Sequence, residues 1–574
     1  MSFIFNDPSD FVTEMLEGFL AAHAGQVMRV AGGVVRAHET PSGEVAVVTG
    51  GGSGHYPAFC GLVGPGLAHG AAMGEVFASP SASRVLSVVR AVHAGAGVFF
   101  TYGNYAGDGL NFDAAQDQLR GEGVSCHTVR VTDDVSSAPR EERHNRRGVA
   151  GDLTVLKVAG AAAAAGYSLD RLVAVAERAN ERTFTFGVAF SGCTLPGAPE
   201  PLFVVPAGRM GVGMGIHGEP GVGEGPILGA RELAAMLVNR LLEEKPVGVP
   251  EQGARVVALV NGLGSVKLEE LFLLYGQIQR ELGQAGITVW QPEVGELVTS
   301  FETAGVSLTL FWLDDELENL WSAPATAPAY HKGQVTGGAR SPRLLEVSSY
   351  ELGTNEASAE SVRLGTAISE MLDIARRTID KAAGELGRLD AVAGDGDHGL
   401  GMQRGTRAAS EAAQKVAGTV GAQSVLRVAG DAWAERAGGT SGALWGALLR
   451  DLGGILGDDA PAEPERIVLA LHEAARGLTS RGGAVPGDKT MVDAVLPFVA
   501  AFAEAIQGGR DVTAALGLSA EAAMVAAAAT ADLVPKRGRA RTHGEKSLGT
   551  PDPGAQSFAL IVHDLAQNYG GGSS

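Results

Sequence analysis

The sequence contains 574 residues, with 45 Lys and Arg against 65 Asp and Glu, so its net charge at pH 7 is −20. An acidic chain without a basic run lacks the cationic surface that nucleic acids and anionic membranes attract, so we expect neither as a partner. Glycine accounts for 82 residues, about twice its usual share. The length corresponds to about three or four domains, and the glycine content indicates many tight turns and backbone-lined ligand loops.

The cysteine content and the N-terminus favour a cytoplasmic protein. Cys60, Cys126 and Cys193 are too few and too scattered for a disulfide framework or a zinc site. The segment MSFIFNDPSDF has no basic region, which argues against a signal peptide. Since no stretch offers about 18 unbroken apolar residues, we expect no membrane span.

Up to residue 321 the sequence alternates short β-rich runs with helical stretches. Strands are predicted at Glu44–Val48, Gly97–Tyr102, His127–Asp133, Thr183–Phe190, Ala254–Val260 and Val306–Leu313. Helices are predicted at Thr154–Gly166 and Leu169–Arg182. This alternation predicts α/β layers with parallel or mixed sheets, divided into subdomains at residues 1–180 and 181–321. Ligands of such sheets bind where the strands end, and several of these strands are followed by glycine clusters.

Residues 322–346 are predicted to form a linker, because Ser322–Pro342 is rich in Ala, Pro, Gly and Ser and has no hydrophobic period. Beyond it, an apolar repeat of about 3.6 residues from Leu364 to Ile379 predicts an amphipathic helix. Alanine-rich helical patterns follow at Ala408–Ala417, Val425–Ala437, Ile467–Gly477, Val492–Gln507 and Leu518–Leu533. Residues 347–574 are therefore predicted to form an all-α domain.

Two glycine motifs resemble nucleotide fingerprints without their context. Gly213–Gly218 fits G-x-G-x-x-G, but the following segment supplies no strand ending in an acidic residue, so a dinucleotide site is not expected. Gly482–Thr490 approaches a P-loop, but Asp488 separates the last glycine from the lysine and would repel phosphates. Any nucleotide must therefore be held by other loops.

The segment Leu389–Gly401 concentrates carboxylates. Asp390, Asp395 and Asp397 lie within eight residues, and clustered like charges repel one another unless a cation neutralises them. Carboxylate oxygens suit Mg²⁺ shared with substrate phosphates. An EF-hand would need a Glu at its twelfth position, which this loop lacks. The alternative is a solvated acidic turn.

Further tight loops between the predicted helices could hold phosphates. Gly438–Gly442 precedes a helical run whose N-terminal N–H groups are free to bind an anion. Gly487–Asp493 and Gly549–Gly554 are similar loops, and Arg539 and Lys546 supply cations nearby. Together with the aspartates they suggest a Mg²⁺–ATP site without a P-loop, in which positioning and charge neutralisation serve phosphoryl transfer.

Here the chain resembles the dihydroxyacetone kinases in their single-chain, ATP-dependent form. The motifs that match the substrate-binding half are Gly50–Pro57, Phe77–Ser81, Asn104–Phe112, Arg146–Gly151, Gly187–Pro196 and Gly215–Gly221. Those that match the ATP-binding half are Gly394–Gly399, Gly438–Gly442, Gly487–Asp493 and Asp552–Gly554. The resemblance implies two α/β subdomains that bind substrate and an all-α, helical-barrel-like domain that binds ATP.

The resemblance also implies residue roles. His217 matches the histidine that attacks the keto carbon of the substrate and forms a hemiaminal, and a neutral imidazole is a competent nucleophile. His55 and Asp108 match residues that bind substrate hydroxyls and assist proton transfer. Substrate contacts are also expected from Gly52, Ser53, Gly54, Tyr56 and Gly103, and Mg²⁺ ligation from Asp390, Asp395 and Asp397. ATP contacts are expected from His398, Gly399, Leu400, Gly401, Thr440, Ser441, Thr490, Met491, Arg539, Asp552, Pro553 and Gly554.

Two departures from the family pattern fall at the substrate pocket. Tyr56 stands where the family has Glu, and Gly103 stands where it has Lys. Losing Lys and Glu together removes an opposite-charge couple, and glycine is expected to leave room for one more hydroxymethyl carbon. We therefore expect a four-carbon tetrulose, D- or L-erythrulose, as the preferred ketose, and the family branch with G-H-Y-P looks like one that acts on erythruloses.

Alternatives remain at this point. A dihydroxyacetone or glyceraldehyde kinase is one, and a non-catalytic ketose-binding regulator is less favoured, because a regulator has no need of the aspartate cluster at residues 390–397. Cyclisation of FAD at the nucleotide site stays open. In fused relatives one subunit's helical domain serves the partner's sugar site, so the resemblance also implies a homodimer with a shared active site.

Overall fold

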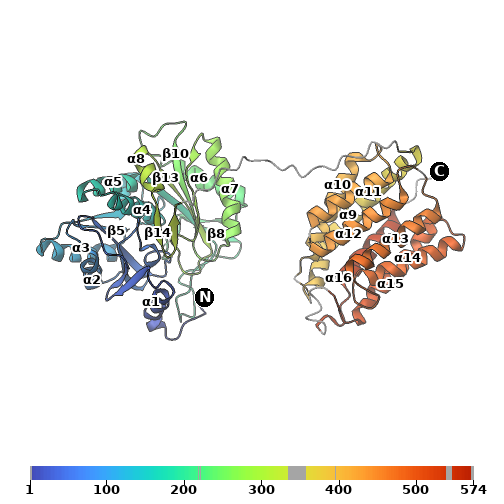
Figure 1. Cartoon of the computed structure of the whole chain (residues 1–574), viewed down its shortest axis with the longest axis horizontal. Helices are drawn as coiled ribbons and strands as arrows, with labels where there is room; N and C mark the ends of the chain where they lie inside the picture. The colour runs from blue at the N-terminus through green and yellow to red at the C-terminus, as the bar shows by residue number, and fades with distance from the viewer. Residues whose placement is uncertain are drawn as a thin grey trace. The chain divides into compact units, whose positions relative to one another are not determined.

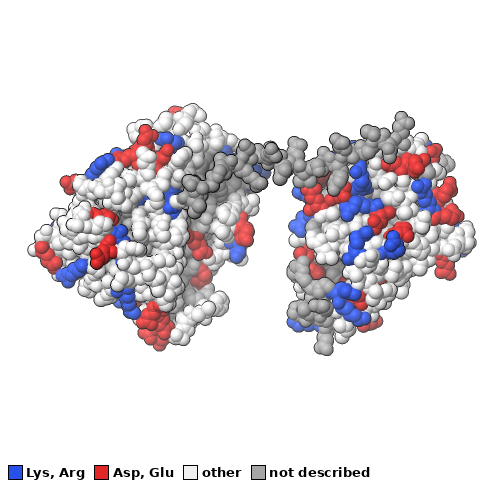
Figure 2. Space-filling model, in the orientation of Figure 1, with Lys and Arg blue, Asp and Glu red and all other residues white. Residues whose placement is uncertain are grey.

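The computed structural model describes residues 3–333 and 357–569, apart from residues 218, 220, 393, 395, 438, 460 and 538–545. The chain divides into two compact units, Met1–Ala339 and Arg340–Ser574 (Figure 1). Lys and Arg lie interspersed with Asp and Glu on the face of each unit that Figure 2 shows.

The first unit begins with a mixed sheet in the order β1-β2-β4-β3-β5-β6. Its strands are β1 (Val27–Val30), β2 (Gly33–Arg36), β3 (Ala46–Ser53), β4 (Gly70–Val76), β5 (Val98–Gly103) and β6 (Cys126–Val131). Strands β4, β3, β5 and β6 run parallel, and β1 and β2 add an antiparallel edge. The helices are α1 (Phe11–Ala22), α2 (Ala82–Val92), α3 (Ala106–Gly121), α4 (Gly151–Ala164) and α5 (Leu169–Glu181).

A second sheet has the order β11-β10-β13-β7-β8-β9, with β12 also paired to β10. Its strands are β7 (Thr183–Ala189), β8 (Arg209–Val212), β9 (Gly223–Pro226), β10 (Arg255–Gly262), β11 (Thr288–Val289), β12 (Glu293–Gly295) and β13 (Gly305–Trp312). Its helices are α6 (Ala230–Leu242), α7 (Leu268–Gln284) and α8 (Asp315–Ser322). The central strands β10, β13 and β7 are antiparallel.

Helix α4 joins the two sheets into one unit. It contacts β3 and β5 of the first sheet and β7 and β13 of the second, and its residues from Gly151 to Ala163 are all buried. A helix that is buried on every side needs mostly apolar or small residues, which fits the alanine-rich sequence of α4. Its one lysine, Lys157, is also buried and donates to the Leu320 carbonyl, 2.8 Å away.

The predicted linker begins too early. Residues within the expected range 322–346 form the hairpin β14 (Ala325–Ala327) and β15 (Tyr330–Lys332). Ala325, Ala327 and Tyr330 belong to the hydrophobic core of the first unit. This hairpin is therefore part of the α/β unit.

Between residues 357 and 569 the described chain forms eight α-helices. They are α9 (Ala359–Asp390), α10 (His398–Val416), α11 (Ala422–Ala437), α12 (Gly439–Leu456), α13 (Pro464–Gly482), α14 (Val492–Gln507), α15 (Val512–Ala529) and α16 (Pro553–Asn568). Each helix packs against the next, and α16 packs against α9, so the helices close into a ring. The ring surrounds an apolar cavity of about 290 Å³. The predicted fold class, an α/β half followed by a barrel-like helical half, is confirmed.

One helix of the described chain, Val512–Asp532, is long and apolar enough to cross a membrane by length and composition. Ser519 and Glu521 interrupt its apolar residues, so the criterion of about 18 unbroken apolar residues does not select it. Helix α15, which makes up most of this segment, packs against α14 and α16 of the helical unit.

Candidate active site

The turn after β3 buries His55. Gly54 has φ = +108°, and a Cβ there would lie 2.7 Å from the Phe301 ring and 2.8 Å from the Phe77 ring, so only glycine fits this turn. A Cβ at Gly52 would likewise lie 2.6 Å from the backbone nitrogen of Ala78. The backbone therefore turns sharply between two aromatic rings and places the His55 side chain in the interior.

Ser53 takes a structural position in this turn. Its side chain is buried and donates to the Gly74 carbonyl, 2.8 Å away, so the hydroxyl points into the sheet. Any contact of Ser53 with a substrate would have to use its backbone.

His55 and His217 face each other. His55 Nδ1 donates to the Thr299 carbonyl at 2.7 Å, and its Nε2 lies 3.0 Å from His217 Nε2. His217 Nδ1 lies 3.0 Å from Glu219 Oε1, while Glu219 Oε2 accepts from the His217 backbone N–H at 2.9 Å. Carbonyl and carboxylate oxygens accept only, so both Nδ1 atoms carry hydrogen.

The two facing Nε2 atoms therefore share one further proton, because two neutral rings with protonated Nδ1 atoms would present only lone pairs to each other. Burial, together with the charge of His217, lowers the pKa of His55 to about 3. Burial opposes ionisation of Glu219, but its hydrogen bond and charge interaction with His217 prevail and bring its pKa to about 2.

Aromatic rings fix the orientation of His217. The rings of Phe77 and Tyr105 meet it edge-on, with centroids 5.2 Å and 4.7 Å away. Phe77 also stacks on His55 at 4.8 Å and has φ = +52°, a backbone conformation that is uncommon for a bulky residue. The imidazole thus has little freedom to rotate.

Asp108 lies half-buried in the first turn of α3. Its Oδ1 is buried and has no hydrogen-bond partner within the described chain. Burial raises the pKa of Asp108 to about 6, although a hydrogen bond from Ser79 and the charge of His217 oppose the rise. A buried polar atom without a partner is costly unless a ligand satisfies it, so this oxygen is a candidate contact for a substrate hydroxyl.

The space expected beside Gly103 is not empty. A Cβ at Gly103 would lie 2.9 Å from the Tyr105 ring and 3.4 Å from Asp152 Oδ2. Tyr105 donates to the Gly148 carbonyl at 2.8 Å, which holds the ring in that position. The steric argument for a longer ketose was therefore wrong, because an aromatic ring occupies the volume that glycine leaves.

Tyr56 lies on another side of the turn. Its ring packs edge-on against Phe19, with centroids 6.1 Å apart, and a Cβ at Gly61 would touch it at 3.0 Å. The side chain is 44% exposed. These contacts direct the ring toward α1 instead of toward the two histidines.

In the helical unit the aspartate loop joins α9 to α10. Asp390 is the last residue of α9, Asp397 is the N-cap residue of α10, and His398 begins that helix. Gly394 folds over Asp390 so closely that a Cβ would lie 2.3 Å from Asp390 Oδ1. Carboxylate oxygens are donors that Mg²⁺ prefers, but the described residues contain no group of three His, Cys, Asp or Glu side chains that could hold a metal ion. Asp395 lies outside the described residues.

Contacts between helix ends bring other expected residues to the same region. His398 Nε2 lies 3.1 Å from Ser557 Oγ of α16, while Gly399 packs so closely on α9 that a Cβ would lie 1.9 Å from the Ala383 carbonyl oxygen. Gly401 faces the end of α11, where its Cβ would lie 3.9 Å from the Ala437 carbonyl oxygen. Leu400 is 59% exposed. Helices α9, α10, α11 and α16 therefore meet around the aspartate loop.

Thr440 and Ser441 lie in the first turn of α12, which begins at Gly439, and both are exposed. The N–H groups of a first turn have no partner within the helix and can bind an anion. Arg539, expected as a cation for the nucleotide, lies outside the described residues.

The last group lies where α14 and α16 begin. Asp493 accepts from the backbone N–H groups of Gly487 and Thr490 and so shapes the turn before Met491. Met491 lies against Gly554, whose Cβ would be 3.5 Å from Met491 Cβ. Asp552 caps α16 through Ala555 N at 2.7 Å, with Pro553 at the start of that helix. Burial raises the pKa of Asp552 to about 7.

The sequence interpretation missed Phe77, Tyr105, Thr299 and Glu219. Glu219 could have been found, because it lies two residues after His217 in the same glycine loop. Thr299 contributes only a carbonyl oxygen, which carries no sequence signal. The rings of Phe77 and Tyr105 resemble ordinary core residues in the sequence.

Comparisons with known proteins agree with this architecture. Residues 17–329 match the Dak1 domain, and residues 392–567 match the DAK2 domain. The chain is 53% identical to the L-erythrulose kinase of Pectobacterium atrosepticum, covering 98% of this chain and 95% of that one. It is 51% identical to the D-erythrulose kinase of Mycolicibacterium smegmatis, covering 99% of this chain and 98% of that one.

A solved structure extends the similarity to the fold. The crystal structure of the dihydroxyacetone kinase of C. freundii is 28% identical with a TM-score of 0.59, covering 99% of both chains. That kinase has also been crystallised with AMP-PNP and Mg²⁺. The fold and the site thus define a protein with one Dak1 and one DAK2 unit. The chain belongs to the dihydroxyacetone kinase family.

Proposed function

We propose that this protein is an ATP-dependent kinase that phosphorylates a terminal hydroxyl of a short-chain ketose held as a hemiaminal on His217. The observation that carries the proposal is the contact of His217 with His55 on one ring nitrogen and with Glu219 on the other. A histidine with its Nδ1 proton fixed by a carboxylate presents Nε2 as the nucleophile.

Capture would begin when the proton that the two facing Nε2 atoms share moves to His55 Nε2. The freed lone pair of His217 Nε2 then forms a bond to the keto carbon, and the electron pair of the C=O bond moves to oxygen. His55 donates its Nε2 proton to this oxygen and becomes neutral. The alkylated His217 ring keeps its Nδ1 proton and one positive charge, which the Glu219 carboxylate balances.

Phosphoryl transfer would require a base and a Mg²⁺–ATP site. Asp108 would accept the proton of the attacking hydroxyl through its unpartnered Oδ1. Bound Mg²⁺ would neutralise phosphate charge, and Asp390, Asp395 and Asp397 would hold it. The starts of α10, α12 and α16, with Thr490 and Met491, would hold the nucleotide.

Asp108→Asn is expected to lower kcat by at least about 100-fold, because the amide cannot accept a proton. In the parent protein, kcat should fall as the pH drops below about 6, where Asp108 becomes protonated.

The same substitution should also change stability. The pKa of Asp108 is higher in the folded protein than in the unfolded chain, so the folded protein binds the proton more tightly. This contribution to the free energy of unfolding is lost as the pH rises through about 6. The amide should therefore raise the free energy of unfolding at neutral pH, by at most about 3 kcal/mol.

Steady-state kinetics and thermal unfolding of the Asp108→Asn protein measure both effects. Asp113→Asn is the matched control, because Asp113 lies on the same helix and pairs with Arg130 at the surface. A variant at Asp108 with undiminished kcat would remove this residue from the mechanism.

We infer that the preferred ketose is a tetrulose, D- or L-erythrulose. The names of the most similar relatives support this inference, whereas the volume beside Gly103 does not. The test is kcat/KM for dihydroxyacetone, D-erythrulose and L-erythrulose with ATP and Mg²⁺. One erythrulose should exceed dihydroxyacetone by about tenfold or more, the discrimination that one extra carbon can supply. Glycerol, which has no carbonyl to capture, is the negative control, and a preference for dihydroxyacetone would refute the inference.

We further propose that the protein acts in the cytoplasm as a homodimer with an active site shared between subunits. The ketose residues and the ATP residues lie on different compact units of the chain, so turnover requires one unit to meet another. The second unit of the partner chain would supply the ATP.

A further inference from the structure

Arg147 lies between the loop that carries His217 and the first sheet of the α/β unit. Its Nε and Nη2 atoms lie 3.0 Å and 2.7 Å from Asp134 Oδ2. Its Nη1 lies 3.9 Å from Glu219 Oε2, and its Nη2 lies 3.5 Å from the Gly213 carbonyl oxygen. The guanidinium therefore contacts one carboxylate just beyond β6 and another in the His217 loop.

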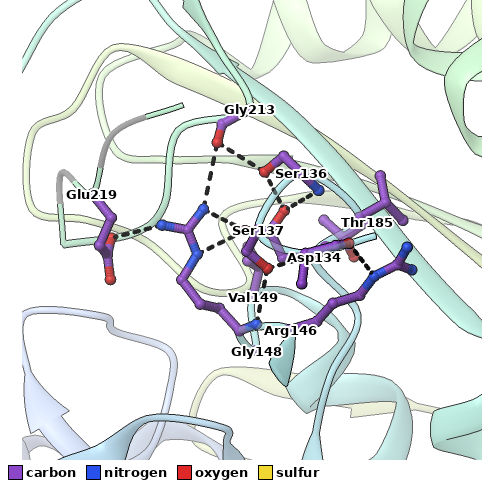
Figure 3. A network of polar contacts seen from close by, with 12 residues as sticks. Asp134, Ser136, Ser137, Arg146, Gly148, Val149, Thr185, Gly213 and Glu219 are labelled. Carbon is purple, nitrogen blue, oxygen red and sulfur yellow. Dashed lines mark hydrogen bonds and ion pairs between the residues drawn. The ribbon is translucent and has the colours of Figure 1, made fainter. Parts of the chain in front are cut away.

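Backbone contacts hold Arg147 in place. Its N–H donates to Ser137 Oγ at 3.0 Å, and its carbonyl accepts from the Asp134 N–H at 3.1 Å. Ser136 Oγ donates to the Gly213 carbonyl at 2.8 Å. Arg147 therefore connects a single polar network, whose other members in Figure 3 include Asp134, Ser136, Gly213 and Glu219.

The His217 loop is shaped to admit this contact. A Cβ at Gly215 would lie 2.2 Å from Glu219 Oε2 and 2.8 Å from Arg147 Nη1. The carboxylate and the guanidinium thus meet directly over the α-carbon of Gly215, where any side chain would separate them. The same Glu219 carboxylate accepts from the backbone and from Nδ1 of His217.

The charges around the contact are complementary. Glu219 faces His217 and Arg147, with His55 and Tyr105 nearby, whereas Arg147 faces Asp134, Glu219 and Tyr105. Burial opposes the charge of Arg147, but the carboxylates of Asp134 and Glu219 outweigh it and raise its pKa. Tyr105 stays neutral, because burial raises its pKa well above the usual value.

We propose that Arg147 is a positioning residue for the covalent step: it holds Glu219 so that the proton stays on Nδ1 of His217 and Nε2 remains the nucleophile. The inference rests on the proposed capture of a ketose by His217. In the adduct the positive charge of the alkylated ring needs the Glu219 carboxylate beside it, so a displaced carboxylate weakens the adduct as well as slowing its formation.

The test is binding of erythrulose to the full chain without ATP, measured by calorimetry and by the mass of the adduct. Arg147→Met should weaken capture by about 10- to 100-fold, the usual effect of losing a charge-assisted contact. Arg147→Lys should recover part of it, because a lysine keeps the charge but not the fork that reaches both carboxylates. The KM for ATP should stay within twofold, since the nucleotide residues lie on the other unit.

Arg147→Met leaves Asp134 buried without its cation, so the variant could lose capture merely by unfolding. The double variant Arg147→Met with Asp134→Asn removes that unpaired charge. We expect it to regain thermal stability but not capture. The matched control is Arg146→Met with Glu244→Gln, which removes the neighbouring buried ion pair, with N–O distances of 3.2 Å and 3.1 Å. This pair has no hydrogen bond or ion pair with the described residues of the His217 loop. Its capture should stay within twofold of the parent.

The outcomes separate the two hypotheses. If the parent protein forms no ketose adduct, the proposed function fails. Two results would overturn the inference while the parent still forms the adduct. In the first, Arg147→Met binds erythrulose as well as the parent does. In the second, the double variant with Asp134→Asn regains capture together with stability, which would make Arg147 a structural residue.

Discussion

The His217→Ala protein is expected to show no substrate-mass adduct and to lose at least about 1000-fold in kcat/KM, because the methyl side chain cannot form the proposed covalent bond to the ketose. The neighbouring rings of His55, Phe77 and Tyr105 should remain in place. Intact-mass measurements with erythrulose and steady-state kinetics with ATP and Mg²⁺ test the two effects separately.

The control for this experiment is His127→Ala. His127 lies on β6, is half-exposed and lies 3.9 Å from Glu177 at the surface, far in sequence from the His217 loop. Its removal should change neither the adduct nor kcat/KM by more than about twofold. A His217→Ala protein that still forms the adduct would transfer the nucleophile role to another residue.

Asp390→Asn is expected to lower ATP-dependent turnover by at least about 100-fold while leaving the ketose adduct intact. The amide keeps the shape of the side chain at the end of α9 but removes the charge that is proposed to bind Mg²⁺. The proposed adduct forms on a residue of the other compact unit, so its formation should not respond. Turnover measured over a range of Mg²⁺ concentrations should show a raised requirement for the ion.

Asp459→Asn serves as the control, because its side chain is 84% exposed and lies 3.8 Å from Arg466. A mixture of the His217→Ala and Asp390→Asn chains adds a test of assembly. If the helical unit of one chain serves the ketose unit of its partner, mixed dimers contain one intact pair of sites and turnover returns. Full activity of Asp390→Asn alone would contradict the proposed metal site.

Much of the fold could be predicted because local sequence signals and tertiary structure agree. The β-branched run at Thr183–Phe190 forms β7 (Thr183–Ala189), and the predicted helix Val492–Gln507 has the same bounds as α14. In the first case threonine alternates with phenylalanine along a strand that is buried at all but one position, and in the second a helical period follows the turn at Gly487.

Other features depend on contacts that no local pattern records. The hairpin of β14 and β15 has the composition of a linker, and Ala325 and Tyr330 become core residues only because the α/β unit offers them a surface. His55 and His217 lie 162 residues apart in the chain yet 3.0 Å apart in space. The Tyr105 ring fills the volume beside Gly103 for the same reason, since its position is set by a backbone carbonyl at Gly148.

Among the described residues, the buried hydrophobic clusters of the α/β unit share no member with those of the helical unit, so the two units have separate hydrophobic cores. Heat or denaturant can therefore unfold one unit while the other stays native, and a single midpoint does not describe such a chain. A substitution near His217 should move the transition of the α/β unit, and one near Asp390 that of the helical unit. If the proposed sites are right, erythrulose and Mg²⁺–ATP should each protect a different transition and thereby report which unit each one binds.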